Sequence, residues 1–233
     1  MRQLKKFMAM ALMLLLPVGA GAQEHPVVVE LFTSQGCSSC PPADAYLHKL
    51  AKRDGVIALA MHVDYWDYIG WKDSFASPKM TARQRGYART GNRRMVYTPQ
   101  MIINGQDHVV GNRPKDVEEL IQRHARAGAV MALSATREGN QVMVRGETLT
   151  PVKGPAVVQL IRFMPRQTVD IKRGENAGRS LSYANIVTEI RELRDWDGKG
   201  ALEFSAQISG SGPGVILVQG ADHGPVLAAA YIE

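Results

Sequence analysis

The stretch VVVELFTSQGCSSCPPAD, residues 27–44, is the most informative part of the chain. Its apolar beginning is interrupted only by Glu30 and predicts a buried β-strand. Proline is favoured in the first turn of a helix, so Pro41 predicts that a helix begins there. Cys37 and Cys40, the only two cysteines, therefore lie between a strand and a helix with C-x-x-C spacing.

This placement favours thiol chemistry at the two cysteines. The N–H groups and the dipole of a helix N-terminus stabilise a thiolate, so we expect Cys37 at an exposed helix start as the nucleophile and Cys40 as the resolving thiol. An inert disulfide is the alternative, although closing so short a loop gives only about 2 kcal/mol of stabilisation. The sequence favours a thiol-disulfide oxidoreductase that acts on protein or peptide thiols and disulfides and is recycled by an unidentified redox partner.

The first 22 residues predict a cleaved signal peptide. Arg2, Lys5 and Lys6 precede about a dozen apolar residues, and Ala20-Gly21-Ala22 supplies the small residues of a cleavage site. An uncleaved anchor is the alternative, but the run is too short to span a bilayer comfortably. We therefore expect a periplasmic or secreted protein with no stable membrane span after cleavage, in which thiols are open to oxidation.

The charge balance argues against a nucleic-acid partner. Loss of residues 1–22 removes three of the 28 basic residues and none of the 22 acidic ones, so the net charge falls from +6 to +3. One basic segment remains, and it indicates either a solvated helix face or a surface for an acidic partner. It contains, without an intervening acid, Lys79, Arg83, Arg85, Arg89, Arg93 and Arg94.

A change of sequence pattern near Gly128 predicts two domains. Residues 24–127 predict an α/β unit in the order strand, helix, strand, helix, strand, strand, helix. Its first two strands require a parallel crossover. Asn104-Gly105 predicts a type I′ turn between the last two strands, residues 100–103 and 108–110.

Residues 128–233 alternate between apolar and polar positions with period 2, which predicts a β-rich, sandwich-like domain. Residues 156–163 and 169–172 are expected as two separate short strands. Residues 182–194 fit both periods and are consistent with either a strand or a helix.

A proline far along the chain supports the redox interpretation. Thr98-Pro99 precedes the strand at residues 100–103, where proline sacrifices a ladder hydrogen bond and a cis peptide bond is least unfavourable. Residues 27–127 resemble the thioredoxin superfamily in their order of elements, their C-x-x-C and this proline. The resemblance implies a cis-proline at Pro99 that lies against the cysteines, and a backbone at Thr98 that is offered to a substrate peptide.

The chain also carries four distinctive segments: ELFTSQGCSSCPPAD at 30–44, VDYWDYIGWKD at 63–73, YTPQ at 97–100 and RGENAGR at 173–179. They resemble an exported bacterial family, domain of unknown function 1223, over nearly the whole mature chain. The resemblance implies a thioredoxin-like domain followed by a β-rich region, without a known substrate. No tryptophan precedes Cys37, and Ser38-Ser39 replaces the Gly-Pro of ordinary thioredoxins, which leaves the direction of the reaction open.

Glu30 and two aromatic residues complete the candidate site. Thioredoxins place an acidic residue behind the C-x-x-C, so the resemblance implies that Glu30 is buried and moves the proton of Cys40; a carboxylate that faces water is the alternative. Tyr65 and Trp66 follow the second strand and are expected at the same sheet edge as the cysteines, where they would bind substrate together with Thr98. Covering the core is the alternative for each aromatic ring.

Two further classes of function stay open. Cys37 and Cys40 would bind copper or zinc if His62 joined them, although the absence of a Met- or His-rich tract near the cysteines weakens the copper reading. A non-catalytic interaction protein is the other class. No organic cofactor is expected, because the sequence has no nucleotide-binding fingerprint and dithiol exchange needs only two sulfurs.

Overall fold

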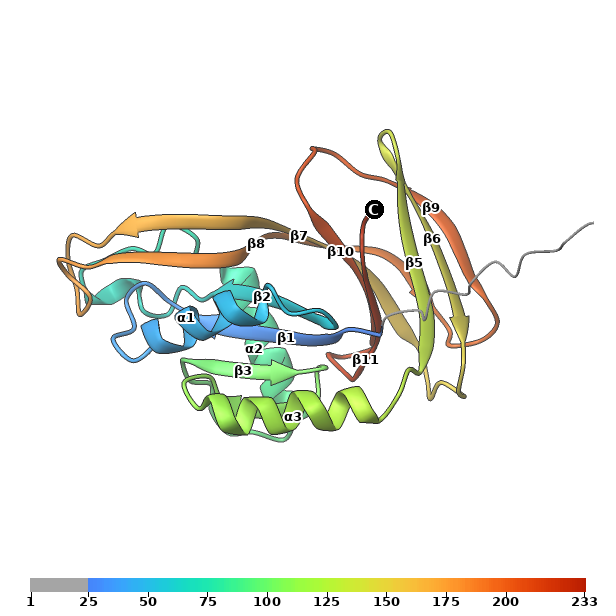
Figure 1. The fold of residues 1–233 in the computed structure, drawn as a ribbon, viewed down its shortest axis with the longest axis horizontal. Coiled ribbons are helices and arrows are strands. Elements are labelled where there is room, and N and C mark those ends of the chain that lie inside the picture. The colour runs from blue at the N-terminus through green and yellow to red at the C-terminus, as the bar shows by residue number, and fades with distance from the viewer. Residues whose placement is uncertain (1–24) are drawn as a thin grey trace, which may run out of the picture.

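The computed structural model describes residues 25–233, so the predicted signal peptide at residues 1–22 lies outside the described residues. The described chain is a mixed α/β structure rich in strands (Figure 1). In chain order its elements are β1 (Val27–Thr33), α1 (Pro41–Leu50), β2 (Val56–His62), the 3-10 helix η1 (Asp67–Ile69), α2 (Pro78–Thr90), β3 (Gln100–Ile103), β4 (Asp107–Val110), α3 (Pro114–Arg126), β5 (Met131–Glu138), β6 (Gln141–Thr148), β7 (Ala156–Asp170), β8 (Ser180–Trp196), β9 (Leu202–Gln207), β10 (Gly214–Gly220) and β11 (Val226–Tyr231).

Two sheets organise these strands. The larger has eight strands in the order β11-β10-β7-β8-β2-β1-β3-β4, and the smaller has three in the order β5-β6-β9. β1 and β2 are parallel, while β3 is antiparallel to β1 and forms a hairpin with β4. Asn104 and Gly105 have positive φ angles of 46° and 67°, as a type I′ turn requires. The element order expected for residues 24–127 is thus confirmed.

β1 lies inside the large sheet and separates two cores, because successive side chains of a strand point to opposite faces. Val29 and Leu31 pack with α1 and α3 on one face. Val28 and Phe32 pack with α2 on the other. Both faces are therefore buried, and any polar side chain on β1 needs a partner inside the protein.

The large sheet continues across the expected domain boundary at residues 127/128. β8 lies beside β2, where Ala60 pairs with Ile186, and β7 pairs with β8 along almost its whole length. β10 and β11 then extend the same sheet. The strands after Gly128 do not make a separate pair of sheets: four of them complete the first sheet, and β5, β6 and β9 form the second.

Two strands are longer than the sequence pattern predicts. Residues 156–163 and 169–172 were expected as separate strands, but β7 runs without a break from Ala156 to Asp170. Register shifts between Val158 and Gln159 and between Arg162 and Phe163 interrupt the alternation along its pairing with β8. The ambiguous residues 182–194 lie within the strand β8.

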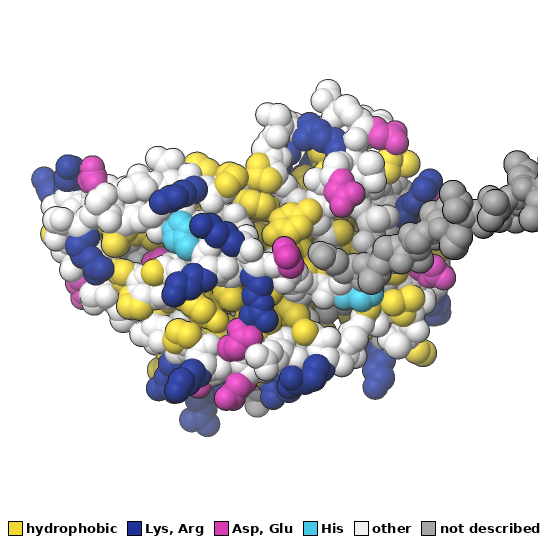
Figure 2. Space-filling model, in the orientation of Figure 1, with side chains coloured by type: hydrophobic (Ala, Val, Ile, Leu, Met, Phe, Trp, Pro, Cys, Tyr) yellow, Lys and Arg dark blue, Asp and Glu magenta, His cyan; other side chains and the backbone are white. Residues whose placement is uncertain are grey.

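The smaller sheet packs on the part of the large sheet formed by β7 and β10, in a sandwich-like arrangement. Val142 and Val144 of β6 share a core there with Val158 of β7 and Ile216 of β10. Figure 2 shows basic and acidic side chains scattered over the visible face. Within residues 25–233, no helix combines the length and apolar character needed to cross a membrane.

Candidate functional site

Cys37 and Cys40 form a disulfide in the loop that joins β1 to α1. Their Cα atoms are 5.4 Å apart, and Cys40 caps the N-terminus of α1. Only 1% of Cys37 and 0% of Cys40 is exposed, although Ser38 and Ser39 between them are exposed. The structure therefore differs from the expectation of an exposed Cys37 at the helix start, because Cys37 lies before the cap and is covered.

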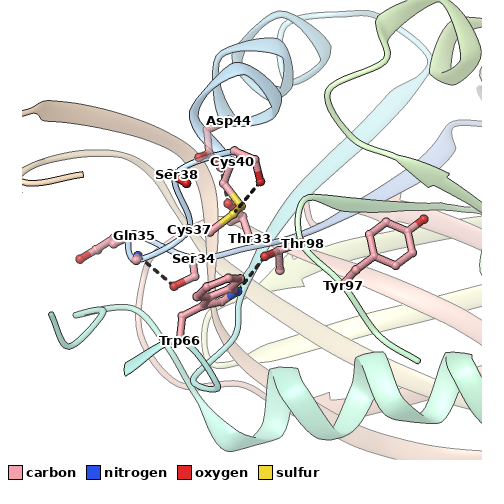
Figure 3. The surroundings of a disulfide bond; sticks show 12 residues. Thr33, Ser34, Gln35, Cys37, Ser38, Cys40, Asp44, Trp66, Tyr97 and Thr98 are labelled. Atoms are coloured by element: carbon pink, nitrogen blue, oxygen red, sulfur yellow. Dashed lines mark hydrogen bonds between the residues drawn. A yellow bond between two sulfur atoms is a disulfide. The ribbon is translucent and has the colours of Figure 1, made fainter. Parts of the chain in front are cut away.

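Trp66 and Thr98 lie beside this disulfide (Figure 3). Trp66 Nε1 donates a hydrogen bond to Thr98 Oγ1 at 2.8 Å, and the Thr98–Pro99 peptide bond is cis. A Cβ built on Gly36 would lie 3.2 Å from the Cβ of Trp66, so the two loops meet closely there and a larger residue would require a small shift. The fold thus brings three distant segments together at the disulfide, while a role in substrate binding stays a prediction.

The turn between β7 and β8, residues 171–179, covers the cysteine loop; we call it the β7–β8 turn. Asn176 Nδ2 donates to the backbone oxygens of Gln35 and Cys37, at 2.9 and 3.0 Å. Asn176 is itself buried, and its Oδ1 accepts a hydrogen bond from Arg179 at 2.9 Å. These bonds hold the turn over Cys37.

A second contact fixes the same turn from its exposed side. Glu175 Oε2 accepts a hydrogen bond from the backbone N–H of Ser38 at 3.2 Å. Gly174 has a φ of 77° and lies against Trp71, which joins the turn to the loop after β2. The sequence singled out residues 173–179 only as part of a family resemblance, since nothing local in them indicates a partner about 140 positions away.

Asp44 is a buried carboxyl one turn after Cys40 in α1 (Figure 3). Its Oδ1 accepts a hydrogen bond from Thr33 Oγ1 at 2.8 Å, whereas its Oδ2 has no partner among the described residues. Burial raises the pKa of Asp44 to about 7, and the neighbouring His62 and the bond from Thr33 offset this only in part. Near neutral pH this carboxyl is therefore able both to take up and to release a proton.

A sequence comparison assigns the family. The family described as "Protein of unknown function (DUF1223)" matches residues 28–219, which is most of the chain. The chain belongs to this family. No curated protein matches the DUF1223 chain significantly.

Two solved structures resemble this DUF1223 protein. One is the crystal structure of a protein from Agrobacterium tumefaciens, with 36% sequence identity and a TM-score of 0.78; the match covers 91% of this chain and 96% of the other. The second is HBP35 of Porphyromonas gingivalis, with 14% identity and a TM-score of 0.61, covering 91% of this chain and 76% of that one. The second likeness shows a shared fold alone.

Glu30 of the DUF1223 protein is buried, but on the face of β1 that packs against α2. Its Oε1 accepts a hydrogen bond from Arg83 Nε at 2.6 Å, and its Oε2 accepts one from Tyr87. Arg83 also donates to Gln219 of β10 at 3.0 Å. The structure therefore does not bring Glu30 to Cys40, and it gives this carboxylate an ion pair that ties β1, α2 and β10 together.

His62 is also buried, at the end of β2, and its Nδ1 contacts Asp73 Oδ2 at 2.7 Å. Burial raises the pKa of Asp73, but His62 and the N–H groups of Gln35 and Phe75 outweigh this and hold it below the ordinary value. Within residues 25–233, no group of three or more His, Cys, Asp or Glu side chains is arranged to hold a metal ion. The set of Cys37, Cys40 and His62 is thus not assembled as a metal site in the disulfide form.

Tyr65 lies next to Trp66 and contacts α2, while its expected role in substrate binding stays a prediction. Its hydroxyl donates to Gln84 of α2 at 3.1 Å, and burial raises its pKa to about 12. Its ring lies 6.4 Å from that of Trp66, between centroids. Trp66 lies beside the disulfide (Figure 3), and Tyr65 packs between Trp66 and Gln84 of α2.

Proposed function

We propose that this protein is an exported, thioredoxin-like oxidoreductase that exchanges its Cys37–Cys40 disulfide with the thiols of a protein or peptide. The observation that carries the proposal is the C-x-x-C disulfide between a strand and a helix, beside a cis Thr98–Pro99 bond. The arrangement of β1, β2, β3 and β4 with α1 to α3 supports a thioredoxin-like core, extended by β7 and β8. The predicted signal peptide supports a periplasmic or secreted location.

The proposed exchange starts from the disulfide seen in the structure. A substrate thiolate attacks Sγ of Cys37, the Cys37–Cys40 bond breaks, and its electron pair leaves on Sγ of Cys40. A second substrate thiol, after losing its proton to water, attacks the mixed disulfide and releases Cys37 as a thiolate. The substrate leaves oxidised and the protein holds two thiols, which an unidentified redox partner reoxidises. The same steps in reverse reduce a substrate disulfide.

Asp44 is the proposed proton donor to Cys40. The Cys40 thiolate forms in a buried place, where a charge is costly and a proton must be close at hand. Asp44 lies one turn along the same helix, and its pKa of about 7 leaves a large protonated fraction at neutral pH. Glu30 is unsuited to this role because Arg83 keeps it paired on the opposite face of β1.

Exchange also requires movement of the β7–β8 turn. A thiolate must reach Sγ of Cys37 in line with the bond that breaks, yet only 1% of Cys37 is exposed. Asn176 and Glu175 hold the turn through three hydrogen bonds to the cysteine loop. In the proposed mechanism the turn opens, and a substrate backbone takes its place beside Trp66 and Thr98.

The test is a trapping experiment with the full chain after export. Cys40→Ser leaves Cys37 without its resolving thiol, so mixed disulfides with substrates should accumulate and disappear on reduction. Cys37→Ser is the matched control and should give none, because it lacks the thiol that is proposed to form the mixed disulfide.

The reduction potential of the wild-type pair provides a second measurement. A value well below about −300 mV, together with no trapped adducts from Cys40→Ser, would identify an inert structural bridge and overturn the proposal. A potential above that range with adducts specific to Cys40→Ser supports exchange.

A further inference from the structure

A shallow hollow of about 480 Å³ lies on the outer side of α2 and is basic. Arg85 and Arg89 line it from the helix, and Arg93 and Arg94 line it from the segment that follows. Met95 forms part of its wall and is 73% exposed, which is unusual for so large an apolar side chain. The hollow therefore combines four guanidinium groups with the apolar side chains of Ala88, Met95 and Val96.

The four arginines differ from Arg83, the other arginine of the basic segment. Arg83 is buried and paired with Glu30. Within residues 25–233, none of the four forms an ion pair of 4.0 Å or less with an acidic side chain. Arg85 and Arg89 are one helical turn apart and repel each other. Acidic side chains of the described residues therefore do not neutralise the positive charge of this surface, and an acidic partner could pair with it.

A second hollow continues the first along α2. It shares Arg85 and Arg89 with the first and extends to Pro78 and Asp64. Asp64 accepts a hydrogen bond from Thr81 Oγ1 at 2.5 Å and is the one acidic residue of the described chain that lines either hollow, against four arginines. The two hollows form one basic groove along the helix.

Each of the two hollows includes a residue that is close in sequence to one of the residues beside the disulfide. Val96 lines the first hollow and precedes Thr98 by two residues, while Asp64 precedes Trp66 by two. Two residues span at most about 7 Å. A polypeptide that lies across Trp66 and Thr98 is therefore within reach of the arginines on either side.

We propose that this basic groove binds an acidic stretch of the polypeptide that carries the reacting cysteines. Carboxylates of Asp or Glu would pair with Arg85, Arg89, Arg93 and Arg94, and an apolar residue would cover Met95. The assignment of this groove to the substrate rests on the exchange proposed above. Binding of an acidic peptide to the groove does not require the cysteines. It assigns a substrate class: thiol proteins or peptides with acidic residues near their cysteines.

The first experiment measures binding without redox chemistry. Cysteine-free peptides of equal length, one rich in Glu and one rich in Lys, are titrated into the full chain by fluorescence anisotropy. The Glu peptide should bind at least tenfold more tightly at 20 mM salt than the Lys peptide, and this difference should shrink at 500 mM salt because the charges are exposed. Equal affinities would overturn the inference.

Variants locate the surface and separate polypeptide from other polyanions. Arg89→Glu combined with Arg93→Glu should abolish the preference for the Glu peptide. Lys115→Glu combined with Arg126→Glu, at two exposed positions of α3, changes the net charge equally and is the matched control, which should retain the preference. Loss in both variants would place the site elsewhere. A single-stranded oligonucleotide of the same charge that bound more tightly than the Glu peptide would identify a nucleic-acid surface and overturn the assignment to polypeptide.

A second experiment keeps this inference distinct from the proposed function. Oxidation of dithiol peptides with Glu or Lys flanks is compared with oxidation of uncharged dithiothreitol. A rate about tenfold higher for the Glu peptide supports both proposals. Equal rates for the two peptides, with normal oxidation of dithiothreitol, would refute the acidic specificity alone; no reaction with any dithiol, with Glu-peptide binding intact, would refute the exchange alone.

Discussion

A carboxyl group is buried on each of the two faces of β1, but the two groups differ in the partners that surround them. Glu30, on the α2 face, is held by Arg83 and Tyr87 and keeps its charge balanced. Asp44, on the α1 face, receives one hydrogen bond from Thr33 and has no cation in contact. The Glu30–Arg83 ion pair connects β1 to α2, whereas Asp44, which has no such ion pair among the described residues, has a pKa of about 7. The comparison teaches that burial alone does not set the pKa of a carboxyl group: Arg83 contacts Glu30 directly, whereas His62 offsets the burial of Asp44 only in part.

The largest effect is expected from removing the counter-charge of Glu30. Arg83→Met leaves a buried carboxylate without its cation, so the free energy of unfolding at pH 7 should fall by about 3–5 kcal/mol. Guanidinium denaturation would measure this. The double variant with Glu30→Gln should recover part of the loss, and an equal loss in the double variant would mean that Arg83 acts through packing instead of charge.

A smaller effect of opposite sign is expected for Asp44→Asn. The pKa of Asp44 is about 7 in the folded protein and near 3.8 when unfolded, so the folded state binds the proton more tightly and wild-type stability falls as pH rises between about 4 and 7. Asn keeps the acceptor for Thr33 and carries no charge. The variant should therefore gain about 2–4 kcal/mol relative to wild type at pH 8 and little at pH 4.

Denaturation curves at both pH values test this expectation. Asp54→Asn, at an exposed position, is the control and should change stability by less than about 0.5 kcal/mol at either pH. A gain for Asp44→Asn that does not depend on pH would show that Asp44 is not the titrating group.

The next effect concerns access to the α1 face. Asn176→Ala removes two hydrogen bonds that close the β7–β8 turn over the cysteine loop, worth about 2 kcal/mol together. If opening precedes attack, the disulfide should be reduced by dithiothreitol about tenfold faster or more. Asn140→Ala in the exposed β5–β6 turn should leave the rate unchanged, and an unchanged rate in Asn176→Ala would show that the turn does not limit access.

The smallest effect is expected at Trp66, which touches neither carboxyl. Trp66→Phe keeps an aromatic ring but loses the N–H bond to Thr98 Oγ1, so stability should fall by about 1 kcal/mol. Urea denaturation followed by circular dichroism would measure the change. Thr98→Val lacks the same bond and should give a similar loss, and the double variant should lose little more than either alone if the bond is the cause.

Much of the first half of the fold follows from local sequence signals. Pro41 marks the start of α1, and Asn104-Gly105 specifies the β3–β4 turn. The placement of β7 and β8 could not be predicted in this way, because an alternation of apolar and polar residues predicts a strand but does not show which strand it pairs with. Residues 164–168 contain Pro165 and polar side chains and therefore resemble a break between two strands, although β7 continues through them.

The site was predictable to the extent that short motifs define it. Cys37, Cys40 and Thr98-Pro99 have recognisable patterns, and the structure places them together. Asp44 was missed because an acidic residue in the first turn of a helix is ordinarily a solvated partner of the helix dipole. Its burial depends on long-range packing of α1 against β8, which contributes Tyr183, and no local pattern reports such packing.

The β7–β8 turn also sets an order of events in the making of the protein. Asn176 follows Cys40 by 136 residues in the chain, an interval of roughly 7–27 s at ordinary rates of synthesis. The cysteines are thus synthesised well before the residues that enclose them, and the cysteine loop stays open until the β7–β8 turn has folded over it. Access to the bond between them therefore depends on when the β7–β8 turn folds, as well as on the final geometry.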